Sequence, residues 1–394
     1  MRMRTRSSSP MRPGRPGRSE GAIRPEGADG TGIGRRAHPA WEMRRRPGGK
    51  ICFEPWRDRM AVFEKTMRGA LGLGAAALAA TILAGTAAAA ELKTWKHGMV
   101  QAKSDAGIVT MANHQNFDEK FGLDLEYVQF KGDALALKAL IAGELDSYEG
   151  SPGGPLLAAS KGADIKIVGC YWPGLTYGIF SRPDIASPAE LKGKTLAISS
   201  PGALPDLIAR AVLEKNGIDP SEVKFASMGS DSDRFRAVSA GVVDAAAAST
   251  EFVRFAESQG LKLLVHAHDV APNYLRFCTY VTSKTLAERG DEVAAYLAAQ
   301  MMGVRYALAH PDESIALSKE MTKAAADDPR AADVFAEVKQ YDAVDPDMPV
   351  PMEKLAWMQD LLTATGNLKQ KVDLAKLVDD SARQKALELA AKSN

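Results

Sequence analysis

The sequence predicts an α/β protein with two lobes, each a mainly parallel sheet flanked by helices, and two observations carry this prediction. Strand-like and helix-like segments alternate in two successive series, and a connection containing Pro and Gly at 181–194 separates them. A short pattern also occurs twice, from Gly143 and from Gly241: a Gly ends a helix, a strand follows, and a polar turn follows the strand. Open α/β sheets bind ligands beyond the carboxyl ends of their strands, so these turns are expected to line a cleft between the lobes.

Apolar runs and alternating patterns predict the strands, and periodic apolar positions that stop at Gly predict the helices. In the first series we expect strands at 92–100, 123–130, 145–150 and 164–172, and helices at 109–122, 133–143 and 155–161. In the second series we expect strands at 195–199, 223–227, 242–249 and 262–268, and helices at 204–216 and 231–240. A strand at 278–283 follows, and then helices to the end of the chain, at 293–308 and from Pro351.

Residues 1–59 differ in composition from the rest of the chain. They contain 14 Arg and one Lys against six acidic residues, whereas residues 91–394 contain 33 basic and 42 acidic residues. With almost no apolar periodicity, residues 1–59 cannot bury a core and are expected to be disordered. A basic arm is typical of nucleic-acid or membrane binding. We favour the alternative that this extension comes from a mis-assigned start, and we expect no nucleic-acid partner.

Residues 60–90 have the pattern of a secretory signal peptide. Lys65 and Arg68 precede an apolar stretch at 69–84, and three Ala residues at 88–90 provide small residues for cleavage. The stretch is too short and too rich in Ala and Gly to favour a membrane-spanning helix. We therefore expect translation to start at Met60 or Met67 and the exported protein to begin near Glu91.

The three cysteines bear on export and anchoring. Cys52 precedes the signal peptide, so no cysteine stands at the cleavage site to carry a lipid, and the exported protein is expected to be free in the periplasm. Cys170 and Cys278 each lie in an apolar, strand-like run. Two separate buried thiols are expected there, although an exported protein also permits a disulfide between them.

Several polar and aromatic residues at strand ends are candidates for ligand contacts. Ser151, and Ser200 with Gly202, lie in small-residue loops that open helices, where backbone N–H groups can approach a ligand; ordinary turn chemistry is the alternative. Trp172 and Tyr177 flank a Pro-Gly turn and are placed to stack on a flat ligand or to belong to the core.

Charged candidates have similarly ordinary alternatives. Glu251, Glu149 and Asp105 suit recognition of amino groups, or they are solvated acids and helix caps. Arg276 suits an anionic group, with a structural ion pair as the alternative. His266 and His268 alternate on a predicted strand, but no further ligands are placed near them, so we expect no metal site and no cofactor.

The region from about Leu92 to Leu308 resembles the nitrate/sulfonate/taurine-type solute-binding proteins of bacterial ABC importers, a family that also holds binders of thiamine-pyrimidine precursors. The segments that carry the resemblance are 121–130 (FGLDLEYVQF), 136–146 (ALKALIAGELD), 150–155 (GSPGGP), 187–225 and 237–251. The resemblance implies a two-lobe periplasmic-binding-protein fold of type II, with two crossovers between lobes. It places lobe 1 at 91–182 with 277–394 and lobe 2 at 183–276, and closure is expected near 181–184 and 276–279.

By position, the resemblance also implies that Gln101 and Ser104, together with Ser151, Trp172, Ser200, Gly202 and Glu251, line the cleft. The sequence shows no obvious Lys/His cluster or Arg pair at these positions, which favours a neutral or partly cationic heterocyclic or aromatic solute over nitrate or a sulfonate.

The resemblance implies a function in binding rather than catalysis. We expect a monomeric, periplasmic solute-binding subunit that delivers a small organic solute, sulfonate- or taurine-like or heterocyclic, to a membrane permease and its ATPase. The alternative is an enzyme on the same scaffold, related to thiamine-pyrimidine precursor synthesis. Those synthases carry a Cys-rich iron-binding stretch that this sequence lacks, and its export signal does not suit them.

Overall fold

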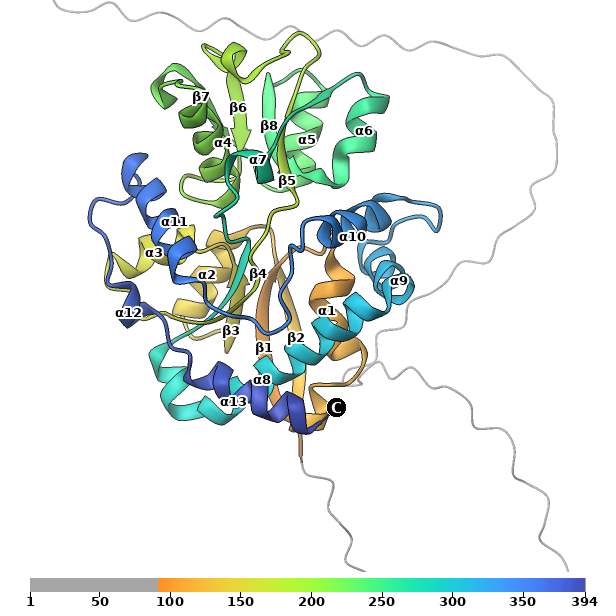
Figure 1. Ribbon diagram of the computed structural model, residues 1–394, viewed down its shortest axis with the longest axis vertical. Helices are drawn as coiled ribbons and strands as arrows, with labels where there is room; N and C mark the ends of the chain where they lie inside the picture. Colours follow the sequence, from red (N-terminus) through yellow and green to blue (C-terminus); the bar gives the residue numbers. More distant parts are fainter. Residues whose placement is uncertain (1–90, 394) are drawn as a thin grey trace, which may run out of the picture. The chain divides into compact units, whose positions relative to one another are not determined.

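A computed structural model describes residues 91–393, and the expectations for residues 1–90 lie outside this range. Two five-stranded sheets, each flanked by helices, form two lobes (Figure 1). This confirms the predicted fold class.

The first sheet forms the centre of lobe 1 and has the strand order β2-β1-β3-β10-β4. β1 pairs in parallel with β2 and β3, whereas β10 returns late in the chain and pairs antiparallel with β3 and β4. The strands are β1 (Lys93–Val100), β2 (Leu123–Phe130), β3 (Ser147–Gly150), β4 (Lys166–Trp172) and β10 (Phe277–Val281).

The second sheet forms the centre of lobe 2 and has the order β7-β6-β8-β5-β9. β6 pairs in parallel with β7 and β8, and β5 lies antiparallel between β8 and β9. The strands are β5 (Tyr177–Ser181), β6 (Thr195–Ile198), β7 (Lys224–Ser227), β8 (Ala245–Ser249) and β9 (Lys262–His266).

The helices follow the same division between the lobes. Lobe 1 carries α1 (Ala106–His114), α2 (Asp133–Ile141), α3 (Gly153–Ala159), α8 (Ser283–Ala309), α9 (Pro311–Thr322), α10 (Arg330–Gln340), α11 (Met352–Ala364), α12 (Leu374–Leu377) and α13 (Ser381–Lys392), with the 3₁₀ helix η1 (Glu119–Phe121). Lobe 2 carries α4 (Leu204–Lys215), α5 (Asp231–Ser239), α6 (Val253–Ser258) and α7 (Ala267–Val270), with η2 (Pro188–Leu191), η3 (Pro220–Glu222) and η4 (Thr250–Phe252). Among residues 91–393, no helix is both long and apolar enough to cross a bilayer.

Two predicted elements differ in kind or extent from the structure, and one strand was not predicted. The helix expected at 109–122 is two elements, α1 and η1, with a break after His114. The predicted strand at 262–268 ends at His266, and His268 belongs to α7, so the two histidines do not alternate along one strand. β5 was not expected: it immediately precedes the Pro-containing connection, it is only five residues long, and Gly178 and Ser181 interrupt its apolar pattern.

The chain crosses between the lobes at 173–176 and again at 271–276. The first crossover is earlier than the boundary expected at residue 182, because β5 pairs entirely with strands of lobe 2. Behind both crossovers, the Lys354 ammonium on α11 donates to the carbonyl oxygens of Pro173 at 2.8 Å and Pro272 at 3.2 Å. These two segments are the connections between the lobes.

The expectation of two separate buried thiols was wrong, because Cys170 and Cys278 form a disulfide. β10 lies directly beside β4, which brings the two Cα atoms within 3.9 Å although 108 residues separate them in sequence. Both side chains are fully buried. The bridge fastens the strand that leaves lobe 1 to the strand that re-enters it, next to both crossovers.

Candidate ligand-binding site

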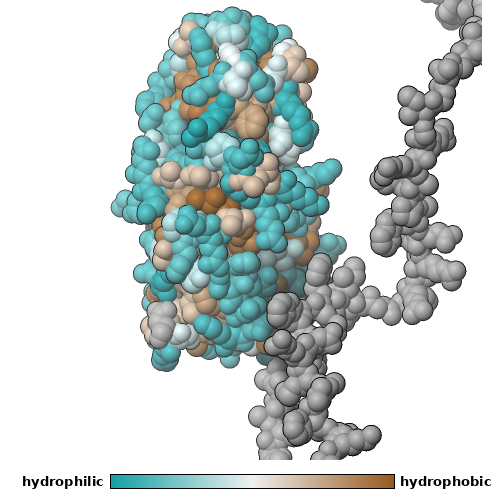
Figure 2. Space-filling model, turned by 90° about the vertical axis from the view of Figure 1, so that its right-hand side faces the viewer, coloured by the Kyte–Doolittle hydropathy of each residue, from teal (hydrophilic) through white to brown (hydrophobic). Residues whose placement is uncertain are grey.

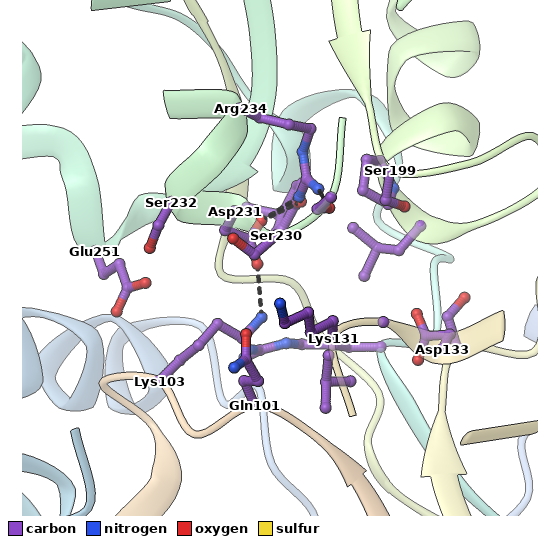
Figure 3. Close-up of a pocket in the computed structure, with 18 of the residues that line it drawn as sticks. Gln101, Lys103, Lys131, Asp133, Ser199, Ser230, Asp231, Ser232, Arg234 and Glu251 are labelled. Atoms are coloured by element: carbon purple, nitrogen blue, oxygen red, sulfur yellow. Dashed lines mark hydrogen bonds and ion pairs between the residues drawn. The ribbon is translucent and has the colours of Figure 1, made fainter. Parts of the chain in front are cut away.

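A cavity of about 120 Å³ lies between the lobes (Figure 3). Lobe 1 contributes the residues after β1 and β2, and lobe 2 contributes the residues after β6 and β7. These are carboxyl ends of parallel strands, where open α/β sheets bind ligands. The polar residues that line the cavity include Gln101, Lys103, Lys131, Asp133, Ser151, Tyr177, Ser199, Ser230, Asp231, Ser232, Arg234, Glu251 and Arg276.

The loop between β1 and α1 provides two contacts from lobe 1 to lobe 2. The Lys103 ammonium lies 3.0 Å from the Asp231 carboxylate. The backbone N–H of Ser104 donates to Glu251 at 3.1 Å, and the Ser104 hydroxyl donates to the same carboxylate oxygen. Because both contacts span the cavity, the structure shows the lobes in a closed arrangement.

Asp231 is the centre of a polar cluster on lobe 2. It is the first residue of α5, and the preceding Ser230 forms a capping box with Asp233 that fixes the start of this helix. The Asp231 carboxylate accepts from Arg234 and from the Tyr177 hydroxyl, each at 2.5 Å. Burial by itself raises the pKa of Asp231, but Lys103 and Arg234 outweigh it and hold the pKa far below its ordinary range.

At Glu251 the effect of burial on the pKa outweighs that of the neighbouring groups, the reverse of Asp231. Glu251 lies on η4, directly after β8, and its side chain is buried. Burial raises the pKa of this carboxyl group, and the hydrogen bond from Ser104 and the charge of Lys103 only partly offset that effect. Asp133, on the lobe 1 side, also has a raised pKa through burial, although it accepts a hydrogen bond from the Tyr148 hydroxyl at 2.8 Å.

Arg276 lies at the end of the second crossover and is almost completely buried. It donates to Asp105, and to the Thr176 hydroxyl at 2.6 Å. Its guanidinium lies 4.4 Å from the centre of the Trp172 ring and 4.6 Å from that of Phe277. Arg276 thus reaches the cavity wall while its charge is already paired with Asp105.

The predicted site residues fall into two groups. Gln101, Ser151, Tyr177, Glu251 and Arg276 line the cavity. The other candidates do not line the cavity. Ser104 donates to Glu251, and Trp172 is fully buried in the lobe 1 core. Glu149 accepts from the Tyr171 hydroxyl inside lobe 1, and Ser200 and Gly202 lie in the loop after β6.

Sequence reasoning missed three of the four cations of the cavity and found only Arg276. Lys103, Lys131 and Arg234 line it together with Arg276, so four positive side chains face three carboxylates. The Ser230-x-x-Asp233 pattern is a capping box and indicates that α5 starts there, with its N-terminal turn beyond the end of β7. Arg234 and Asp231 have the i,i+3 spacing of one helix, so their pairing could be read from the sequence once α5 was placed. The pairing of Lys103 with Asp231 depends on contact between the lobes and could not be read from spacing.

His266 and His268 lie outside this cavity. His266 Nε2 is 2.9 Å from the Glu337 carboxylate, and the His268 ring stacks on Tyr341 with centroids 4.3 Å apart. Within residues 91–393, no group of three or more His, Cys, Asp or Glu side chains is arranged to hold a metal ion.

The chain has a two-lobe fold with a cavity between the lobes, and comparison with known proteins identifies its family. A family model described as NMT1/THI5 like matches residues 103–314, more than half of the chain, so the chain belongs to this family. No curated protein matches the chain.

Solved structures with the same fold are distant in sequence. The alkanesulfonate-binding protein SsuA from Xanthomonas axonopodis pv. citri, bound to MOPS, is 19% identical, with 74% of this chain and 100% of that chain covered and a TM-score of 0.64. The periplasmic nitrate-binding protein NrtA from Synechocystis PCC 6803 is 15% identical, with 76% and 89% covered and a TM-score of 0.65. The desulfurization enzyme DSZB is 16% identical, with 75% and 99% covered and a TM-score of 0.56. At these identities the likeness establishes the periplasmic-binding-protein fold.

Proposed function

We propose that this chain is the extracytoplasmic solute-binding subunit of an ABC importer, which captures a small polar solute by closure of its two lobes. The observation that carries the proposal is the interlobe cavity with polar groups from both lobes. A solute there contacts both lobes only when they are closed, so binding favours the closed arrangement. The permease and ATPase partners, the periplasmic location without a lipid anchor, and the monomeric state are part of this proposal.

The size and charge of the cavity support a small solute with balanced charge. At about 120 Å³ the cavity is smaller than the ~300–1,000 Å³ typical of sites for drug-sized ligands. Its charged residues are nearly balanced, and Lys103, Arg234 and Arg276 are each paired with a carboxylate. Trp172 lies in the core, which removes one of the two stacking aromatics on which a flat heterocyclic solute would depend. A zwitterionic or neutral polar solute, such as a taurine-like compound, suits these groups better than a bare anion.

Native mass spectrometry of protein purified gently from its host tests the proposal directly, because a bound solute adds its mass to the folded chain. A thermal-shift screen of nitrate, taurine, alkanesulfonates, pyrimidines and aromatic acids then tests specificity. A solute at about 100 times its Kd stabilises the fold by about 2.7 kcal/mol. We expect nitrate to give no shift. If no solute co-purifies and none in the screen shifts the melting temperature, the proposal loses its support.

Lys131 offers a way to determine the charge of the solute. Its side chain is exposed at the cavity and, among residues 91–393, forms no ion pair within 4.0 Å. Lys131→Ala therefore leaves the fold intact and weakens binding only of a solute that carries an anionic group. Lys138→Ala on α2, which is exposed but outside the cavity, is the matched control. Titration calorimetry compares both variants with wild type.

The DSZB likeness keeps an enzyme as the second candidate, and the fate of the solute separates the two. A binding protein releases its solute chemically unchanged. Mass analysis of the solute after prolonged incubation with the protein and denaturation gives the answer, since an altered mass would establish an enzyme.

A further inference from the structure

Helix α10 lies at the level where the two lobes meet, on the side of α6 (Figure 1). One face of α10 belongs to lobe 1: Ala331, Val334, Phe335 and Val338 are buried, and the last three pack in the lobe 1 core. Figure 2 looks at this side of the molecule and shows a mainly hydrophilic surface with apolar residues gathered near mid-height.

The opposite face of α10 contacts lobe 2. Asp333 accepts from Arg254 at 2.5 and 2.8 Å in a two-point ion pair, and Glu337 lies 2.9 Å from His266. Arg330 lies over the Phe255 ring at 5.3 Å. Tyr341, at the end of the helix, stacks on His268.

The spacing of these contacts follows the helix itself. Positions 330, 333, 337 and 341 recur every three or four residues and so share one face, while 331, 334, 335 and 338 share the other. A helix that only covered lobe 1 would have solvent on the first face. In this chain every turn of that face has a partner from lobe 2: Arg254 and Phe255 on α6, His266 on β9, and His268 on α7.

The contacts also reach the cavity through one short segment. α6 directly follows η4, and η4 carries Glu251, whose carboxylate binds Ser104 of lobe 1. Holding Arg254 and Phe255 against α10 therefore holds the segment that presents Glu251 to the cavity. None of the four α10 residues lines the cavity.

We propose that the outer face of α10 is an interlobe latch, in which Arg330, Asp333, Glu337 and Tyr341 are positioning residues that favour the closed cleft without touching the solute. This inference rests on the proposed function, because closure has a purpose only if the cleft captures a solute. The affinity for a solute is the product of its intrinsic affinity for the closed form and the closed fraction, so the latch sets affinity from outside the site.

A test without any solute separates the latch from the proposed function. The Ser104 amide donates across the cleft to Glu251, so its hydrogen exchange requires the cleft to open. The Thr195 amide, at the start of β6, donates to Asp244 at 2.8 Å within lobe 2 and serves as the internal control. Residue-resolved hydrogen exchange on the full chain, with no solute added, compares the two amides in each variant.

Arg254→Asp is the variant to measure, because Arg254 is 63% exposed and its replacement leaves the core intact. An exposed ion pair of this kind corresponds to about a two- to fivefold change in an equilibrium. We expect Ser104 exchange to rise by at least that factor while Thr195 exchange stays constant. The double variant Arg254→Asp with Asp333→Arg restores the pair in reverse and should return Ser104 exchange toward wild type.

Lys192→Asp is the matched control, since Lys192 pairs with Glu222 at 2.6 Å entirely within lobe 2. It should leave Ser104 exchange unchanged. The latch is overturned if Arg254→Asp leaves Ser104 exchange at the wild-type rate, or if the charge swap fails to return Ser104 exchange toward wild type. It is also overturned if the wild-type Ser104 amide already exchanges as fast as in an unstructured peptide. All three outcomes can occur whether or not a solute is later found.

Discussion

Glu251 joins the two lobes through a carboxyl group that burial makes costly to ionise. Its pKa lies above the ordinary value of 4.5, so between that value and the raised pKa the folded protein holds a proton that the unfolded chain has released. The contribution of Glu251 to stability is therefore present at low pH and is lost as pH rises through this window. Asp231, which also lines the cavity, has a depressed pKa, so its contribution to stability is present at neutral pH and is lost as pH falls.

Glu251→Gln should remove the first dependence. The amide keeps an oxygen that accepts from Ser104 but cannot ionise, so the variant gains stability relative to wild type as pH rises above the ordinary value of 4.5 toward the raised pKa of Glu251. Asp231→Asn is the opposite control: it loses the pairs with Lys103 and Arg234, which stabilise the fold above the ordinary pKa of 3.8, and its deficit shrinks as pH falls. Melting temperatures above pH 4.5 test the sign for Glu251→Gln, and melting temperatures below the ordinary pKa of 3.8 test the sign for Asp231→Asn. Parallel curves for wild type and Glu251→Gln would contradict the assignment.

Single residues show where sequence reasoning reached its limit. An aromatic residue at a strand end is compatible with both a stacking role and a core role, and for Trp172 only the packing against Phe277, with ring centroids 5.7 Å apart, decides between them. Glu251 was found because a strand end and its polar turn were visible in sequence. Its partner Ser104 comes from the other lobe, 147 residues away, and no local pattern links the two.

At the scale of elements, periodicity predicted most strands and helices, and failed where pairing between distant segments decides the structure. β5 is a five-residue strand whose place between β8 and β9 is fixed by partners about 70 and 85 residues later in the chain. β10 was predicted as a strand, but its insertion between β3 and β4 was not, and that insertion brings the two cysteines together. Long-range pairing of this kind leaves no trace in a local window.

The disulfide closes a loop that contains the whole of lobe 2, because Cys170 precedes the first crossover and Cys278 follows the second. In the chain-entropy account, closing about 100 residues restricts the unfolded chain by up to about 4.7 kcal/mol, and native bridges typically contribute ~2–4 kcal/mol. The variant with Cys170→Ala and Cys278→Ala should lose stability in that range in denaturant titrations. Reductant should destabilise wild type and have no further effect on the variant. Equal stability of the two proteins would show that the bridge does not constrain the fold.

At the scale of the whole molecule, two glycines mark where the lobes meet. Gly153 begins α3 in lobe 1, and its Cα faces the carbonyl oxygen of Gly202 in lobe 2. A Cβ at Gly153 would overlap that oxygen and lie 2.9 Å from Leu207 Cδ1, and both atoms belong to the opposite lobe. Glycine at 153 is therefore required by the closed arrangement, whereas neither lobe by itself excludes a methyl group there.

Gly153→Ala should therefore prevent full closure and leave each lobe folded. We expect faster exchange of the Ser104 amide and weaker binding of whichever solute co-purifies, because the methyl group competes with the contact that closure makes. Gly154→Ala is the matched control: its Cβ would meet only Leu137 Cδ2, at 3.4 Å within lobe 1, so closure should be unaffected. Circular dichroism and exchange of the Thr195 amide, which bonds to Asp244 within lobe 2, report whether the lobes stay intact. Normal binding and wild-type Ser104 exchange in Gly153→Ala would mean that the functional closed state holds the lobes further apart than this structure does.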